Sequence, residues 1–248
     1  MTIITFMRTK SIMHGTPEAL SQLGWIRFRT WSRMMGHAPC CPAEVVRRLW
    51  NDPDSLIADG IPLRNNHGVR TLALNEIGGA KVVVKRYVER SWRHAIKGFV
   101  LPSRAEQAVR NTLAVAAAGI PTPAPLAYRS CLWGALQQPV SYFLYEYLEG
   151  QTLGSFLQSP MVGPQLIERL ATQSRTCWKI LADKGLLLHD PSQSNFLVDR
   201  DAQLWVIDLD KLERHPVSTR FQQLADDSLG RFLRFQSSRR GETTPVTS

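Results

Sequence analysis

A strand pattern followed by a helix with a defined start and end constrains the fold of this chain most. Residues 69–87 contain an alternating segment, a glycine-containing turn and a valine-rich segment, which together predict a β-hairpin. Glu106 follows Ser103 at the spacing of a helix capping box, and an alanine-rich run then continues to Gly119. Pro121 excludes a longer helix, because proline lacks the backbone donor. The sequence therefore predicts a hairpin and then a helix of known bounds.

The second half of the chain predicts one more strand, a long helix, a second hairpin and a final helix. Residues 142–148 are apolar and aromatic, and residues 164–184 carry apolar side chains at helical spacing. Two short apolar runs with a polar turn between them lie within residues 196–207, and apolar residues recur through 218–235. This order of elements predicts an α+β fold.

The beginning of the chain is basic and aromatic, and we expect residues 1–60 to form a partly helical extension. Two interpretations remain open: an amphipathic helix on a membrane surface, or a helix packed on the domain through its aromatic side chains. No apolar run reaches the roughly 18 residues that cross a bilayer. Arg8 interrupts the first apolar run, so we expect no signal peptide and a cytoplasmic protein.

The formal net charge is +9 and the isoelectric point is about 9.8, which indicates an anionic partner. Nucleic acid, an acidic membrane face and a phosphorylated substrate all satisfy this charge. We expect no nucleic-acid partner, because no recognised nucleic-acid reading motif accompanies the basic residues.

Three polar residues in the second half have the spacing of a phosphoryl-transfer site. Asn195 follows Asp190 by five positions, and Asp208 follows Asn195 by thirteen. A kinase catalytic loop and its metal-binding aspartate show these spacings. Lys85 ends a run of three valines, as does the strand lysine that neutralises nucleotide phosphates. Each residue alone also has a structural interpretation. Lys85 also fits a lysine with a buried apolar stem and a solvated ammonium, and Asp208 also fits a solvated turn.

With these motifs the chain resembles the bacterial lipopolysaccharide kinases, which phosphorylate heptose or Kdo sugars of the inner core. The resemblance covers about residues 64–235 and includes the valine-lysine strand, the catalytic loop, and the segments 118–123, 145–150 and 207–211. It implies a two-lobed protein-kinase-like fold with a shortened C-terminal lobe, and it implies ATP and Mg²⁺ as cofactors. By the same resemblance Asp190 is the catalytic base, Asn195 and Asp208 hold the metal, and Lys85 contacts ATP. The backbone from Glu146 to Leu148 would receive the adenine.

Two departures from the kinase pattern limit the resemblance, and the role of Glu106 stays open. The histidine expected two positions before the catalytic aspartate is Leu188, while His189 stands directly before Asp190. The expected glycine-rich loop offers only Gly68, whose backbone we expect to contact phosphate. Glu106 is the available ion-pair partner for Lys85, but its capping-box position is an alternative role.

We expect residues 61–148 to form a nucleotide-binding N-lobe, residues 149–236 a catalytic C-lobe, and residues 237–248 a disordered tail. Only 40 residues follow Asp208, which favours a compact acceptor over a peptide. The expected partner is an anionic glycolipid or sugar, with peripheral contact to the inner membrane. Two alternatives stay open: a kinase of another small alcohol or sugar, and a pseudokinase that binds a partner without transfer. The sequence indicates no oligomeric state.

Overall fold

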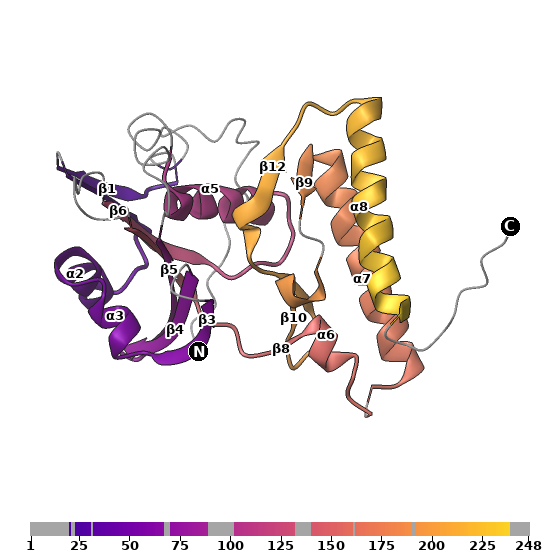
Figure 1. Cartoon of the computed structure of the whole chain (residues 1–248), viewed down its shortest axis with the longest axis horizontal. Coiled ribbons are helices and arrows are strands. Elements are labelled where there is room, and N and C mark those ends of the chain that lie inside the picture. Colours follow the sequence, from indigo (N-terminus) through magenta and orange to yellow (C-terminus); the bar gives the residue numbers. More distant parts are fainter. Residues whose placement is uncertain are drawn as a thin grey trace, which may run out of the picture.

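The chain folds into two lobes of different construction, which are connected by residues 147–150 (Figure 1). A computed structural model describes residues 20, 23–30, 32–66, 70–88, 102–131, 140–160, 162–189 and 192–238. The first lobe is built on an antiparallel sheet, and the second on two long helices with short strands beside them. The α+β, two-lobed fold predicted from the sequence is therefore confirmed.

In the part of the first lobe that the structure describes, seven strands form an antiparallel sheet in the order β1-β2-β6-β7-β5-β4-β3. Its strands are β1 (Ile26–Arg29), β2 (Arg33–His37), β3 (Ile61–Asn66), β4 (Arg70–Ile77), β5 (Ala80–Val88), β6 (Pro125–Cys131) and β7 (Val140–Glu146). The predicted first hairpin is confirmed as β4 and β5. Its turn is formed by Gly78 and Gly79, both at positive φ, a backbone conformation that glycine adopts without strain.

Both faces of this sheet are covered, which explains why β5 has a continuous apolar run rather than a strict alternation. Val82 and Val84 pack under the helices α2 (Ala43–Asn51) and α3 (Ser55–Ala58). On the opposite face, Tyr87 packs against α5 (Arg104–Ala117). Because side chains alternate along a strand, Lys85 shares the α5 face with Tyr87.

The helix α5 begins and ends as the sequence predicts. The Ser103 side chain accepts a hydrogen bond from the backbone N–H of Glu106 at 3.2 Å. Gly119 lies two residues beyond the end of the helix with φ of +83°, a left-handed conformation that stops the helix. The α5 helix is therefore fixed at both ends by local sequence, and it lies between the sheet and the second lobe (Figure 1).

The prediction of helix around the aromatic residues of the N-terminal segment is wrong for residues 26–29 and 33–37. This part forms β1 and β2, and β2 pairs with β6, so the segment extends the sheet. Trp25 is buried against Tyr128 of the sheet, with ring centroids 6.2 Å apart. Trp25 therefore packs into the core beside the sheet, whereas Phe28 of β1 is 45% exposed.

The second lobe contains the predicted long helices and the predicted second hairpin. Its helices are α6 (Leu153–Phe156), α7 (Pro164–Asp183), α8 (Thr219–Ser238), η1 (Gln193–Asn195) and η2 (Leu209–Lys211). Its strands are β8 (Gln151–Thr152), β9 (Leu186–Leu188), β10 (Phe196–Val198), β11 (Leu204–Val206) and β12 (Leu212–Arg214). Strands β10 and β11 form the hairpin, and β9 pairs with β12. Within the described residues, no helix combines the length and apolar character needed to span a membrane.

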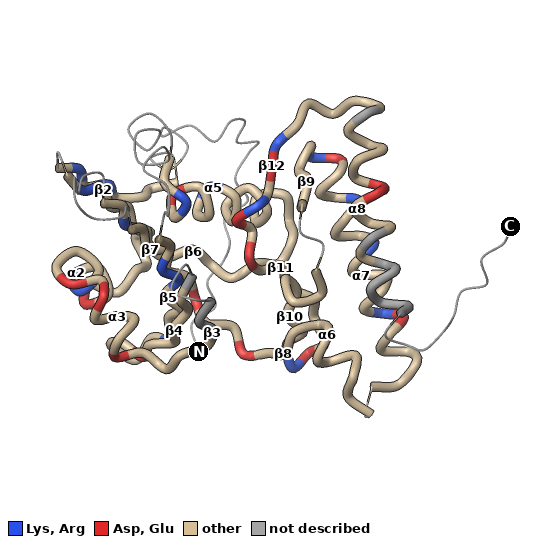
Figure 2. Tube along the Cα trace, viewed as in Figure 1, with Lys and Arg blue, Asp and Glu red and all other residues tan. Residues whose placement is uncertain are grey.

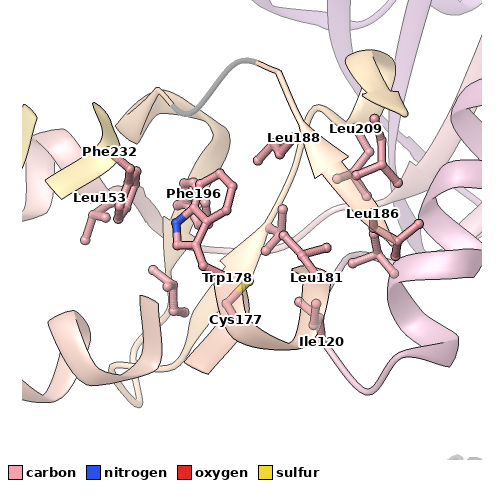
Figure 3. Close-up of a cluster of buried hydrophobic side chains, with 14 of the residues drawn as sticks. Ile120, Leu153, Cys177, Trp178, Leu181, Leu186, Leu188, Phe196, Leu209 and Phe232 are labelled. Carbon is pink, nitrogen blue, oxygen red and sulfur yellow. The ribbon is translucent and has the colours of Figure 1, made fainter. Parts of the chain in front are cut away.

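One aromatic cluster holds α7, α8 and the β10 strand together. Trp178, Phe196 and Phe232 are almost completely buried, and their ring centroids lie between 4.9 and 6.4 Å apart (Figure 3). Of the apolar residues in the predicted final helix, Phe221 of α8 is buried, whereas Leu224 is 42% exposed. The core of this lobe therefore depends on a few large side chains from elements far apart in the sequence.

Gly185 should tolerate alanine less well than Gly119 does. Both have positive φ, but a Cβ at Gly185 would contact the backbone oxygen of His215, whereas the space around Gly119 is open. Gly119→Ala should cost about 1 kcal/mol of unfolding free energy through backbone strain alone. Gly185→Ala should cost about 1–3 kcal/mol more because the added methyl overpacks the site. Urea unfolding measures both values, and equal losses would contradict the close approach at Gly185.

Candidate active site

A buried lysine joins the two lobes by ion pairs. Lys85 of β5 is 3% exposed, and its Nζ lies 2.6 Å from Oδ1 of Asp208 and 2.9 Å from Oδ2 of Asp210. A buried ammonium is stable only when it is paired, because burial removes its hydration. The first lobe therefore supplies the cation, and the segment after β11 supplies both carboxylates.

Tyr87 binds the same carboxylate cluster from the first lobe. Its hydroxyl donates a hydrogen bond to Oδ1 of Asp210 at 2.6 Å, and its ring lies 5.2 Å from the Lys85 Nζ. Burial raises the pKa of Tyr87 well above its ordinary value, and the nearby Asp210 carboxylate raises it further. The phenol therefore stays protonated and acts as a donor. Neither Tyr87 nor Asp210 was predicted as a site residue, although Asp210 is two positions from Asp208.

The backbone turns sharply at Asp208, which directs this carboxylate toward the first lobe. Asp208 has φ of 55° and ψ of 56°, a left-handed conformation that aspartate adopts more readily than most residues. Just before it, the Ile207 N–H donates to the Asn195 carbonyl at 2.8 Å. The short η1 turn, in which Ser192 accepts from the Ser194 N–H, positions Asn195. The predicted pair of Asn195 and Asp208 is therefore brought together.

Lys85, Asn195 and Asp208 line one pocket between the lobes. The pocket is open to solvent, and the space between its walls, open solvent included, is about 570 Å³. Side chains from both lobes form its walls. Besides those three they are Leu72, Thr112, Thr122, Pro123, Phe143, Tyr145, Ser194, Ile207, Leu209 and Asp210. The aromatic residues come from the sheet, and most of the polar groups come from the second lobe.

Asn111 of α5 anchors the carboxylate segment and was not predicted from the sequence. Its side chain is fully buried, and Nδ2 donates to the carbonyl oxygens of Leu209 and Leu212 at 2.8 and 3.3 Å. These two carbonyls flank the residues that follow Asp208. The helix therefore fixes the backbone that presents Asp208 and Asp210 to Lys85. An asparagine in a helix gives no sequence signal for such a contact.

Glu106 does not pair with Lys85 among the described contacts, so its expected role as a nucleotide-site residue is not supported by its position. Its side chain is 2% exposed and contacts Arg110 at 2.6 Å and Arg27 at 3.5 Å. Arg110 lies one turn further along α5, so this ion pair forms within the helix. Glu106 thus acts at the start of α5, and the two aspartates take its place beside Lys85.

The predicted adenine contacts lie where β7 leads into the link between the lobes: Glu146 is the last residue of β7, and Leu148 is two residues further on. The backbone N–H groups of Glu146 and Tyr147 donate to the carbonyls of Ala124 and Lys81. Neither Glu146 nor Leu148 is among the described residues that line the pocket, whereas Tyr145 is. The chain therefore borders the pocket at Tyr145, just before the link begins.

Two predicted residues, Asp190 and Gly68, lie outside the described residues. Near Asp190 in the chain, the structure describes His189, which directly follows β9, and Ser192, which begins the turn that leads to Asn195. On β5, Arg86 pairs with Asp54 at 3.0 Å, next to α3.

The donor set of the pocket suits a divalent cation bound beside a phosphate. Asp208 and Asp210 supply carboxylate oxygens and Asn195 an amide oxygen, which are the donors that Mg²⁺ prefers. Both carboxylates contact the Lys85 ammonium, so acidic and basic groups lie side by side at this end of the pocket. Lys85 is placed to exchange a carboxylate for a phosphate oxygen. The residues present therefore fit a metal-nucleotide complex.

Comparison with solved structures finds similarity to WaaP in complex with acyl carrier protein. The two chains are 20% identical, with 81% of this chain and 88% of that chain covered, and the TM-score is 0.49. No protein-family model matches the chain, and no curated protein matches it. A functional assignment therefore depends on the arrangement of the side chains in the pocket.

Replacement of Asn111 by alanine should loosen the segment that carries Asp208 and Asp210. Two buried carbonyls would lose their donor, which costs about 1–3 kcal/mol of unfolding free energy. Denaturant unfolding measures this loss. Gln107→Ala is the matched control, because it removes a partner of Asn111 but leaves both carbonyl contacts in place. A loss no larger than in the control would mean that Asn111 does not anchor this segment.

Proposed function

We propose that this protein is an ATP-dependent kinase that phosphorylates a sugar hydroxyl of the lipopolysaccharide inner core, on heptose or Kdo. The observation that carries the proposal is the contact of buried Lys85 with Asp208 and Asp210, beside Asn195, in a pocket between two lobes. A strand lysine, a loop asparagine and a following aspartate, in this order, are the parts that kinases use on a metal-nucleotide complex.

Each residue has a distinct role in this proposal. Lys85 would bind the α- and β-phosphates, and Asn195 and Asp208 would hold Mg²⁺, which neutralises phosphate charge when bound. Asp190 would orient the acceptor hydroxyl and accept its proton as the oxygen attacks the γ-phosphate. Asp210, held by Tyr87, would keep Lys85 in position while Asp208 turns to the metal. The backbone of Glu146 to Leu148 would border the adenine, and Gly68 would lie over the phosphates.

The proposal also assigns nucleotide binding to one lobe and catalysis to the other. Residues 61–148, together with β1 and β2 of the preceding segment, would form the nucleotide-binding lobe. Residues 149–236 would carry the catalytic loop and the metal ligands. The choice of a lipopolysaccharide acceptor is supported by the sequence resemblance and by the net charge of +9, which favours an anionic substrate.

A transfer assay with radiolabelled ATP, Mg²⁺ and deacylated inner-core oligosaccharide tests the proposal. The wild type should label the oligosaccharide, and Asp190→Ala should lower the rate by about 10²- to 10⁴-fold through loss of the base. Asp208→Ala should abolish labelling because it removes a metal ligand. Asp183→Asn is the control: this exposed carboxylate on α7 pairs only with Lys179 among the described residues and should leave the rate unchanged.

The other outcomes separate the alternatives. Binding of ATP without labelling of any acceptor would favour a pseudokinase. Labelling of a different sugar or alcohol, but not of the oligosaccharide, would keep the kinase and change its acceptor. Full activity in Asp190→Ala would show that the catalytic residue is wrongly assigned.

We further propose that the hairpin of β1 and β2 contacts the cytoplasmic face of the inner membrane. Ile26 and Phe28 are 46% and 45% exposed on this edge strand, and Arg29 and Arg33 are exposed beside them. Figure 2 shows basic positions along the hairpin. Exposed apolar side chains combined with arginines favour contact with a surface of anionic lipid.

The double variant Arg29→Gln, Arg33→Gln should bind anionic vesicles about 30-fold more weakly, since each arginine contributes roughly 1 kcal/mol at such a surface. Co-sedimentation with vesicles that contain acidic phospholipid measures the binding. Arg175→Gln, an exposed arginine on α7, is the matched control and should bind like the wild type. Equal binding by all three proteins would exclude the hairpin as the contact.

A further inference from the structure

Two histidines and a glutamate converge on the small sheet of β9 and β12, outside the pocket between the lobes. Glu213 lies on β12, His215 follows the end of that strand, and His189 follows the end of β9. The Nε2 atom of His189 lies 2.9 Å from Oε2 of Glu213, and the Nε2 atom of His215 lies 3.1 Å from the same oxygen. All three ligand atoms lie within 4.8 Å of one another.

The fold itself holds these three side chains together. Glu213 and His215 are two residues apart on an extended segment, so they project to the same side. The His215 N–H donates to the Gly185 carbonyl at 2.8 Å, which continues the strand pairing beyond β12. The His215 ring stacks on buried Phe221, with centroids 5.6 Å apart and an interplanar angle of 28°. The ring of His215 is therefore oriented by packing rather than by Glu213 alone.

The donor types and their spacing suit a transition-metal ion. Imidazole nitrogen and carboxylate oxygen are common ligands of Zn²⁺, with bonds of about 2.0–2.2 Å. In a tetrahedral site such bonds separate the ligand atoms by about 3.3 Å. The observed separations of 2.9 and 3.1 Å need to open only slightly to admit an ion. The side chains are 34–56% exposed, so an ion has direct access from solvent.

We propose that His189, Glu213 and His215 bind a divalent transition-metal ion of the Zn²⁺ class, with a fourth position open to water. This site is chemically distinct from the oxygen-rich pocket at Asp208. Nitrogen donors favour zinc-class ions, whereas carboxylate and amide oxygens favour Mg²⁺.

The position of the site gives it a structural consequence, which rests on the proposed function. His189 directly precedes Asp190, and β12 directly follows the η2 turn that begins after Asp208. A bound ion would therefore link the segment that leads into the catalytic loop to the segment that carries the metal-binding aspartate.

Titration of the full-length, tag-free protein with Co²⁺ tests the site, because Co²⁺ in a four-coordinate site absorbs strongly in the visible range. The wild type should bind one equivalent with this absorption, and Zn²⁺ should displace it. His189→Ala and His215→Ala should each weaken Co²⁺ binding at least about 10-fold, as should Glu213→Gln. Glu168→Gln, an exposed glutamate paired with Arg175, is the matched control and should leave the titration unchanged.

Thermal unfolding provides a second measurement. Zn²⁺ should raise the midpoint of the wild type, since a ligand that binds only the folded state stabilises it, and should not raise that of His215→Ala. Circular dichroism shows whether each variant is folded. The proposal is overturned if the wild type shows no four-coordinate Co²⁺ spectrum, or if this spectrum survives in both histidine variants. Neither experiment needs ATP or an acceptor, so failure of the kinase proposal is detected separately.

Discussion

The ion pairs of Lys85 are the interaction on which the arrangement of the two lobes depends. An ammonium group placed in the middle of a covered sheet loses its hydration and must find negative charge inside the protein. Asp208 and Asp210 provide that charge from the other lobe, at 2.6 and 2.9 Å. Removal of either partner would leave a buried charge with less compensation, which is strongly destabilising. The same charges form the polar wall of the pocket, so the requirements of stability and of ligand binding coincide there.

The helix α5 positions the segment that carries the two carboxylates of this contact. Ser103 fixes where the helix begins, and the packing of α5 on the sheet fixes its orientation. Asn111 then holds the carbonyls of Leu209 and Leu212, so the aspartate segment is positioned by a helix of the first lobe. A small movement of α5 would therefore change the distance between Lys85 and its carboxylates. We infer that α5 couples the two lobes mechanically.

Two sets of side chains with metal-binding donor atoms occur in the second lobe, one lining the pocket and one on the sheet of β9 and β12. Toward the first lobe, Asn195, Asp208 and Asp210 offer oxygen atoms. At the sheet, His189, Glu213 and His215 offer two nitrogen atoms and one oxygen. Because hard and borderline cations prefer different donors, the two sets should select different ions. The short segment 208–215 thus contributes to both sets.

The sequence by itself determined the elements whose signals are local. These are the hairpin of β4 and β5 with its glycine turn, the cap at Ser103, and the spacing that brings Asn195 near Asp208. Each depends on residues close together in the chain, where turn chemistry, capping and side-chain alternation act directly.

Only the tertiary structure decided that Lys85 pairs with Asp208 and that Tyr87 binds Asp210. In each pair the two residues are 123 positions apart in the chain. The tertiary structure also decided that β1 and β2 extend the sheet, and that His189 meets Glu213 and His215. Such contacts depend on which buried faces pack together and which strand edges pair. Side chains that are far apart in the sequence and meet in the fold leave no periodic pattern in the chain. The local elements could therefore be predicted from this sequence, whereas the pairing of charges between them required the fold.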